Sequence, residues 1–399
     1  MNPPSRATAF TLLAVACLTI MVGCVIVPGL PAIAPQLGVE RFASALVTVP
    51  SLGVVVLGPL AGWLTARTGL YRTLCIGLFS YGLLGVGGAW LHGPVAVFAD
   101  RFLLGGATAL VMTSGTGLIS VFYDGHARLA MIAKQGMSIE LGGVVFLFAG
   151  GLLAAHGWRW PFALYLFAWL MLALVLAVVP APSPVAGSTH PAHHAGDHAR
   201  DARTPVSNAL RTIYVVAIFS MVSFFTGVIV LPMRFHELGI GEAQTGYFLS
   251  FVSLVAVGAA ASMPRATARI GESGVLVGAF VFYAAAHLCF ALADSVPVFV
   301  VGGVCMGCGF GLSVPLVNHM TVEKSHPRQR GRNLAYLSMA IFFGQFASSF
   351  MAYMPGNAAR IFSVAAVMAL VLACVPAAMR RTLASDATTR ALAETTHVA

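Results

Sequence analysis

The stretch PSPVAGSTHPAHHAGDHARDARTPVSN, residues 182–208, is the longest polar interruption in a chain that is otherwise strongly apolar. Pro, His, Asp and Arg are frequent in it, which is typical of a loop or linker. Apolar sequence lies on both sides, and each side holds six segments long enough to cross a bilayer. The stretch therefore divides the chain into two halves and predicts a two-part membrane protein.

The composition excludes an ordinary aqueous surface. The chain is 58% hydrophobic and 9% charged, with a mean hydropathy of +0.88, whereas a soluble domain has about a quarter charged residues. Segments of about 20 residues, enough to cross about 30 Å of hydrocarbon, can be counted directly. We predict spans at residues 8–32, 43–65, 73–91, 94–122, 132–155, 161–180, 210–232, 244–264, 274–293, 296–321, 333–354 and 359–379. The expected fold is an all-α integral membrane protein with twelve transmembrane helices in two six-helix pseudo-symmetric bundles.

The positive charges predict how the chain is oriented. With a cytoplasmic amino terminus, 17 of the 22 Lys and Arg residues fall on the inside, so the positive-inside rule places both termini and the linker in the cytoplasm. We expect an N-terminal bundle over 1–180, a cytoplasmic His/Pro-rich linker over 181–209, a C-terminal bundle over 210–380 and a cytoplasmic tail over 381–399. The location expected is the inner or plasma membrane, with a monomer in contact with lipid headgroups and no role in nucleic-acid binding.

The amino-terminal apolar run is better interpreted as the first span than as a removable signal peptide. Only Arg6 precedes it, and no small-residue cleavage site lies at the right distance.

Cysteine and histidine give no clear metal or redox site. All seven cysteines fall inside predicted spans, so no disulfide framework is expected. Cys305 and Cys308 have the C-x-x-C spacing, but in a glycine-rich apolar helix they are better interpreted as small packing residues. Four linker histidines, at 190, 193, 194 and 198, could bind a metal or sense pH, although the interspersed Pro, Gly and Ala favour a disordered tether. We expect no cofactor and no metal site.

The two halves repeat. The sequence T-A-R-x-G occurs after the second span, with Arg67 and Gly69, and again after the eighth, with Arg269 and Gly271. Pro31 and Pro232 close the first and seventh spans in the same way. A weak repeat of two six-span halves indicates duplication, with a substrate site between the halves at mid-membrane.

The chain resembles the major facilitator superfamily over nearly its whole length. The resemblance rests on short motifs in a characteristic order. They are Gly62-x6-Gly69 with Arg67 and Arg72, Arg101-x3-Gly105, GWRWPF at 157–162, RGR at 330–332 and GQF at 344–346. Together they look like the drug/proton antiporter branch, and they imply a cytoplasmic gate motif at Gly62, Arg67, Gly69, Arg72, Arg269 and Gly271.

Two positions depart from the pattern of that branch. The family's loop motif usually has an Asp just before the Arg at 67, where it bridges the halves, and this chain has Ala66. Antiporters of the branch tend to carry a Gly-Pro before the Gly-Gly of the fifth span, and here Gly150 and Gly151 follow FLFA without it. The resemblance therefore leaves the bridge, and export as opposed to import, open.

Glu140 is the one acidic residue well inside a predicted span, about 12 Å from its inner end at 1.5 Å per residue. A charge in the membrane costs at least a few kcal/mol, so such a residue is a functional candidate. Burial favours the neutral form of a carboxyl group, which suits a group that takes up and releases a proton. The alternative is a neutral Glu at a helix crossing, since Gly136, Gly143 and Gly150 share its face.

Arg101 lies near the outer third of the span over 94–122. It cannot lose its charge, so it needs a partner, which could be Asp100, Glu140 or an anionic substrate. In the resembling branch an Arg at this position is associated with proton relay. The alternative is an Arg that reaches the outer headgroups beside Asp100.

Other polar and aromatic side chains could line a substrate cavity. The candidates are Gln345, Phe342, His287, Phe224, Met112 and Asn318. For the histidine, packing between helices is the simpler explanation, and for each Phe, packing against lipid or other helices is.

The function expected is proton-coupled secondary transport of a small amphiphilic organic molecule by alternating access, with export favoured over import. Glu140 would carry the proton and Arg101 would bias it or gate its path. The chain lacks the G-x4-G-K-[S/T] loop, so ATP is not expected to drive it, and no catalytic set converges within the spans, so an enzyme is not expected. The alternatives are a proton symporter that imports an anionic nutrient or a metal chelate, and a membrane sensor or scaffold that transports nothing.

Overall fold

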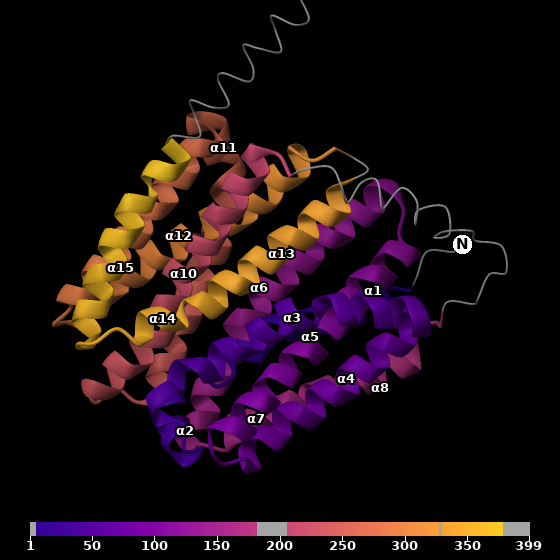
Figure 1. Ribbon diagram of the computed structural model, residues 1–399, viewed down its shortest axis with the longest axis horizontal. Coiled ribbons are helices and arrows are strands. Elements are labelled where there is room, and N and C mark those ends of the chain that lie inside the picture. The colour runs from indigo at the N-terminus through magenta and orange to yellow at the C-terminus, as the bar shows by residue number, and fades with distance from the viewer. Residues whose placement is uncertain (1–4, 182–205, 327–328, 378–399) are drawn as a thin grey trace, which may run out of the picture.

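The computed structural model describes residues 5–181, 206–326 and 329–377, and helices run through most of these ranges (Figure 1). The first half contains α1 (Arg6–Cys24), α2 (Leu30–Gln36), α3 (Ala43–Thr68), α4 (Leu70–Gly87), α5 (Pro94–Phe122), α6 (Gly125–His156), α7 (Trp160–Ala163) and α8 (Phe167–Val178). The second contains α10 (Asn208–Glu237), α11 (Glu242–Leu292), α12 (Val296–Glu323), α13 (Arg330–Ala347), α14 (Ser349–Ala352) and α15 (Ala358–Leu372). The predicted tail and the linker histidines lie outside the described residues.

The helices account for twelve crossings of a membrane. Eleven helices in the described ranges are long and apolar enough to span one. α11 has 51 residues and is interrupted at Gly271, whose backbone is not helical (φ 74°, ψ 164°). At 1.5 Å per residue its length of about 77 Å is more than twice the hydrocarbon thickness, so α11 supplies two spans. The prediction of an all-α protein with twelve transmembrane helices is confirmed.

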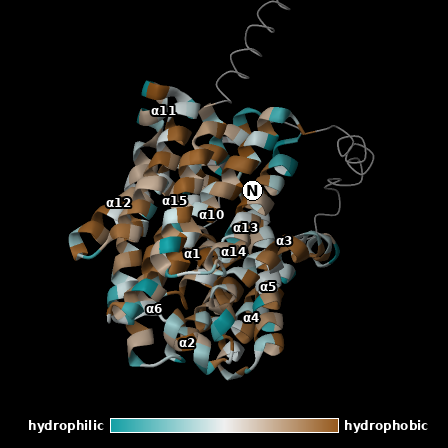
Figure 2. Cartoon of the chain, turned by 60° about the vertical axis from the view of Figure 1, so that its left-hand side comes forward, coloured by the Kyte–Doolittle hydropathy of each residue, from teal (hydrophilic) through white to brown (hydrophobic). Residues whose placement is uncertain are grey.

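Figure 2 shows apolar ribbon along much of the length of the helices and polar segments toward the two ends of the bundle. We call the end where α8 finishes and α10 begins the linker end, and the opposite end the far end. Residues 6–178 are called the N-half and residues 208–372 the C-half.

The first span differs from its prediction as one segment over 8–32. α1 ends at Cys24, and a non-helical stretch leads to α2 at Leu30. Pro28 within this stretch has no N–H to donate, and the residue before a proline is biased away from the helical conformation. The stretch is buried in protein, and the amides of Val27 and Leu30 donate to backbone carbonyls, so its polar groups find partners without water.

The internal repeat extends to the backbone. Gly69 and Gly271, of the repeated T-A-R-x-G sequences, have φ angles of 83° and 74°. Gly38 and Gly239 form a second such pair, with φ angles of 69° and 73°. Glycine adopts this region at little cost because it has no Cβ. Equivalent connections in the two halves therefore turn in the same way.

The halves meet toward the far end. Thr48 of α3 and Ser349 of α14 share a hydrogen bond, and the Ser250 hydroxyl of α11 donates to the Val144 carbonyl of α6 at 3.0 Å. Phe148 of α6 stacks on Tyr247 of α11 with ring centroids 5.1 Å apart. These contacts join the two halves toward the far end of their interface.

A close backbone approach between the halves involves two glycines. A Cβ added to Gly246 of α11 would lie 2.7 Å from the Leu147 carbonyl oxygen and 2.8 Å from the Gly151 Cα of α6. Real Cβ atoms essentially never come so close to backbone, so a methyl group here forces α6 and α11 apart. The absence of side chains at both positions is what permits this closure.

We expect Gly246→Ala to lower the thermal unfolding midpoint of the purified protein, because overpacking costs about 1–3 kcal/mol. Gly258→Ala, in the same helix, is the control, since a Cβ there meets nothing within 4 Å. The control should leave stability unchanged or raise it by up to about 1 kcal/mol, because Ala is the better helix former. Equal midpoints for the two variants would contradict the proposed contact.

Candidate functional site

A cavity of about 130 Å³ lies between the two halves. α1 and α6 form its N-half wall, and α10, α11, α12 and α13 form its C-half wall. The described residues that line it are Thr19, Ile20, Cys24, Ile139, Glu140, Gly143, Leu147, Met221, Phe224, Phe225, Val228, Leu249, Val252, Ser253, Ala256, Phe310, Val314, Ile341, Phe342 and Gln345. A cavity with walls from both halves is where a transporter built from repeats binds its substrate.

Glu140 supplies the one carboxyl group among the described lining residues. α6 begins at Gly125 and ends at His156, so at 1.5 Å per residue Glu140 lies about 22 Å from the start of the helix, near its middle. This is deeper than the sequence predicted, because the helix begins earlier than residue 132. The Glu140 carboxylate makes no hydrogen bond or ion pair with any described residue.

A glycine contact positions this part of α6. A Cβ added to Gly142 would lie 2.9 Å from the Cys17 Cβ of α1, so α6 can pack closely on α1 only without a side chain there. The Cys17 thiol donates to the Ser138 carbonyl oxygen at 3.0 Å, and the Ser138 hydroxyl donates to the Leu13 carbonyl oxygen at 2.9 Å. α6 and α1 are thus joined one turn or less from Glu140.

Aromatic rings form much of the C-half wall. Phe224 of α10 lies 4.0 Å, centroid to centroid, from Phe310 of α12, and 5.5 Å from Phe225. Phe342 of α13 completes this group. The wall suits an apolar or aromatic body.

Gln345 of α13 brings an amide to the same cavity. It is 7% exposed, and a Cβ added to Gly23 of α1 would lie 3.3 Å from its Nε2 atom. The amide therefore crosses from the C-half to the N-half. Thr19, Cys24 and Ser253 supply the other polar groups of the lining.

Three of the predicted cavity residues line the cavity, namely Gln345, Phe342 and Phe224. Met112 is not among its described lining residues, and packs instead on a small apolar cluster between α3, α5 and α13. Asn318 is exposed, and its amide donates to the Val314 carbonyl one turn earlier in α12 at 3.0 Å.

His287 lies inside the C-half, outside the described cavity lining. It is fully buried, and its Nε2 atom donates to the Ser223 carbonyl of α10 at 2.9 Å. Its ring stacks on Phe362 of α15 with centroids 5.9 Å apart. These contacts tie α11 to α10 and α15.

Arg101 lies in a separate, buried cluster of the N-half. Its side chain is 1% exposed, its Nε atom is 3.5 Å from Asp100 Oδ2, and its Nη1 atom donates to the Tyr165 hydroxyl at 3.2 Å. The guanidinium also lies over the ring of Phe162, 5.2 Å from the centroid. Of the partners that the sequence left open for Arg101, Asp100 is the one with which the structure pairs it.

The cluster is connected to α1 through tyrosine. The Tyr165 hydroxyl donates to the Val22 carbonyl at 3.0 Å, and the Tyr81 hydroxyl donates to the Leu18 carbonyl at 2.8 Å. Both carbonyls lie in the last turns of α1, next to Cys24 of the cavity wall. Arg101 is therefore placed to hold the end of α1.

The predicted gate residues lie at the linker end. Gly69 and Gly271 form the turns described above, and the Arg67 guanidinium lies over Trp63 of its own helix, 4.1 Å from the ring centroid. Gly62, Arg72 and Arg269 are exposed.

Sequence reasoning missed Thr19, Cys24 and Ser253 in the cavity, and Tyr165 in the Arg101 cluster. Small polar residues are frequent wherever membrane helices pack, so nothing in the pattern distinguished those of the cavity. Tyr165 is 64 residues from Arg101 in the chain, and periodicity says nothing about a contact of that range.

Comparison with known proteins identifies the class of protein. A family model described as Major Facilitator Superfamily matches residues 11–349, and a second match covers 213–395. The chain belongs to this superfamily, a family of transporters rather than enzymes, and is a multi-pass membrane protein.

Individual relatives are distant. The chain is 32% identical over 119 residues to "Protein TsgA homolog" of Edwardsiella ictaluri (strain 93-146), a match that spans 29% of this chain and 30% of that protein. Its fold is similar to the crystal structure of peptide transporter POT in complex with sulfate, with a TM-score of 0.74, 16% identity and coverage of 96% of this chain and 97% of that one. It is also similar to the crystal structure of a D-xylose-proton symporter, with a TM-score of 0.69, 18% identity and coverage of 92% and 97%. At these identities the two structures share the fold with this chain.

We expect Arg101→Met to destabilise the protein by about 3–5 kcal/mol, because it leaves Asp100 buried without its positive partner. The double variant Asp100→Leu/Arg101→Met should recover much of that loss, since it removes both charges. Arg234→Met is the control, because it breaks the exposed ion pair with Glu237 and should cost at most about 1 kcal/mol. Unfolding in detergent measures all three, and a double variant no more stable than the single one would refute the pairing.

Proposed function

We propose that this chain is a proton-coupled secondary transporter of a small amphiphilic organic molecule, that it works by alternating access, and that it exports its substrate as the drug/proton antiporters do. The observation that carries this proposal is the Glu140 carboxyl group, which lies without a hydrogen-bonding partner in a largely apolar cavity between the halves. The other features below support it.

The cavity lining favours an amphiphilic substrate. Phe224, Phe310 and Phe342 offer an apolar, aromatic surface, while Glu140 and Gln345 offer polar groups from opposite halves. An apolar pocket with a few polar groups orients a ligand by its polar end. A molecule that contacts both halves also helps to determine which arrangement of the halves is stable.

Glu140 is proposed to couple the proton to the substrate. A carboxylate without a partner is costly in an apolar cavity, whereas the protonated group is much less so. The charged form is therefore stabilised when water or the polar part of a substrate reaches it, and the neutral form when the cavity is dry. The similarity to a D-xylose-proton symporter shows that this fold accommodates proton coupling in another protein.

Arg101 and the gate residues are proposed to support this cycle from a distance. Arg101 holds the end of α1 through Tyr165, and α1 forms part of the cavity wall. The glycine turns at Gly69 and Gly271 allow the spans at the linker end to move as paired units, and Arg67, Arg72 and Arg269 lie around them. We propose that this end faces the cytoplasm, since it carries most of the positive charge of the described helices.

The runner-up is a symporter that imports its substrate, which the similarity to the D-xylose-proton symporter favours. An anionic substrate is less well supported, because Arg101 pairs with Asp100 and is not among the described residues of the cavity wall. The direction in which a substrate accumulates under an inward proton gradient distinguishes import from export.

We expect Glu140→Gln to abolish the response of substrate flux to a pH gradient in proteoliposomes, while binding of a neutral substrate persists. Glutamine keeps the size and polarity of the side chain but cannot exchange a proton. Candidate substrates come first from a thermal-shift screen, since a ligand that binds the folded state raises its apparent stability.

Glu237→Gln is the matched control for this experiment, because Glu237 is an exposed acid at the far end of α10. Its flux should respond to the pH gradient as the unaltered protein does. Coupled flux that survives in Glu140→Gln would exclude Glu140 as the proton carrier.

A further inference from the structure

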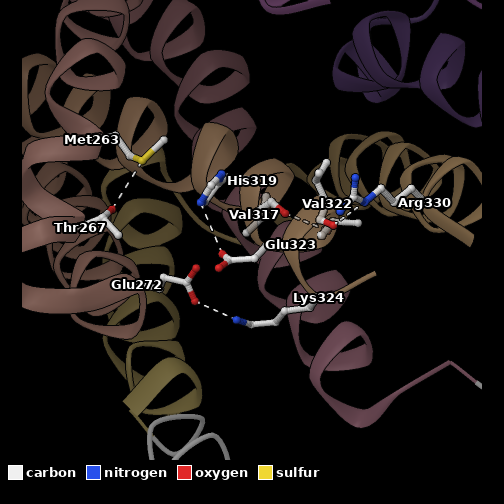
Figure 3. Close-up of polar contacts among 10 residues, drawn as sticks. Met263, Thr267, Glu272, Val317, His319, Val322, Glu323, Lys324 and Arg330 are labelled. Atoms are coloured by element: carbon white, nitrogen blue, oxygen red, sulfur yellow. Dashed lines mark hydrogen bonds and ion pairs between the residues drawn. The ribbon is translucent and has the colours of Figure 1, made fainter. Parts of the chain in front are cut away.

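Three side chains of the types that ligate metals lie together outside the cavity, at the linker end of the C-half (Figure 3). Glu272 of α11 and His319 and Glu323 of α12 each offer one ligand atom, and these atoms all lie within 4.8 Å of one another. His319 and Glu323 are exposed, and Glu272 is half-buried. An ion in the surrounding water can therefore reach the group.

The local structure brings the three residues together. His319 and Glu323 are four residues apart on α12, so they share one face of the helix. Glu272 directly follows Gly271, where the positive φ angle reverses the chain between the two spans of α11. The turn thus delivers a carboxylate to the last turn of α12 from a different helix.

The spacing fits a shared metal ion. Zinc binds histidine nitrogen at about 2.0–2.1 Å and carboxylate oxygen at about 2.0–2.2 Å, in tetrahedral geometry. Two ligand atoms on one such ion are then about 3.3 Å apart. His319 Nε2 and Glu323 Oε2 are 3.5 Å apart. Little movement of either side chain is needed for both to hold the same ion.

The ammonium group of Lys324 lies beside these three residues. Lys324 Nζ lies 2.9 Å from Glu272 Oε2 (Figure 3). The ammonium group neutralises one carboxylate and competes with a metal ion for it. In Figure 3 the other two candidate ligands, His319 and Glu323, form an ion pair with each other and with no other residue drawn.

We propose that Glu272, His319 and Glu323 form a binding site for a divalent transition-metal ion, with Zn²⁺ as the best fit. One imidazole and two carboxylates are ligands that zinc accepts, and a water molecule completes four-coordination. The bound ion ties the turn of α11 to the end of α12. Because both helices belong to the C-half, the site does not depend on how the two halves are arranged, nor on the proposed transport function.

Zinc binding is measured with full-length protein purified without a histidine tag, in a background where His190, His193, His194 and His198 are replaced by Ser. This background removes the linker histidines as competing ligands. We expect one Zn²⁺ per chain by calorimetry, and a rise in the thermal unfolding midpoint on adding Zn²⁺, because the ion binds the folded state.

Variants separate a metal site from a simple ion pair. His319→Asn and Glu323→Gln should each weaken zinc binding about tenfold or more, by analogy with the losses seen when the environment of a metal site is altered. Lys324→Met should strengthen it, because it frees Glu272. His236→Asn is the matched control, since His236 is an exposed histidine next to a glutamate at the end of α10, and it should change nothing.

A purely structural role predicts the opposite pattern. If Lys324 and Glu272 serve only to hold α11 against α12, Lys324→Met lowers the unfolding midpoint and leaves zinc affinity unchanged, which overturns the proposal. Unchanged affinity in His319→Asn, or no stoichiometric zinc in the histidine-free linker background, overturns it as well. Co²⁺ absorption of that background protein gives a test without further variants, because a four-coordinate site absorbs far more strongly than hydrated cobalt.

Discussion

The hydrocarbon core of a bilayer contains no water, so each backbone N–H and C=O that crosses it needs a partner within the protein. The helices meet this requirement by themselves, which is why the chain is helical almost throughout its described length. Irregular backbone is confined to connections or is enclosed by protein. The stretch between α1 and α2 is the clearest case. Val25, Ile26 and Val27 are fully buried, and the amides of Val25 and Val27 donate to backbone carbonyls of α1.

The same absence of water removes most of the hydrophobic force between helices, so association depends on close packing. Glycine makes close packing possible at several helix crossings. A Cβ on Gly150 would clash with the Val25 carbonyl oxygen, and a Cβ on Gly105 would clash with the Pro50 carbonyl oxygen. Contacts of this kind within a half can be permanent. The approach of Gly151 to Gly246 joins the two halves, and it must open if the halves rock. This contact involves no charged side chain, so separating the two glycines would leave no ion pair broken.

The sequence was sufficient for the number of spans, the two-half division and the repeated glycine turns, because each depends on local composition or on identity between the halves. It was not sufficient for the break after Cys24, where Pro28 interrupts a run that hydropathy alone treats as continuous. Which residues each buried side chain contacts was harder still to predict. Gln345 reaches the cavity, whereas His287 turns to the Ser223 carbonyl within the C-half. Helical periodicity predicts the face of the helix on which a residue lies, but not which other helix packs against that face.

The distribution of buried polar groups is what favours Glu140, over Arg101 or His287, in the proposed transport cycle. Arg101 is surrounded by Asp100 and Tyr165 of its own half, and His287 by residues of its own half. The rigid-body rocking proposed above would leave both environments unchanged. Glu140 lies on a wall whose opposite side belongs to the other half, so the proposed rocking would change its access to water and to polar neighbours. A protonation equilibrium can be coupled to alternating access only where the two states present different surroundings.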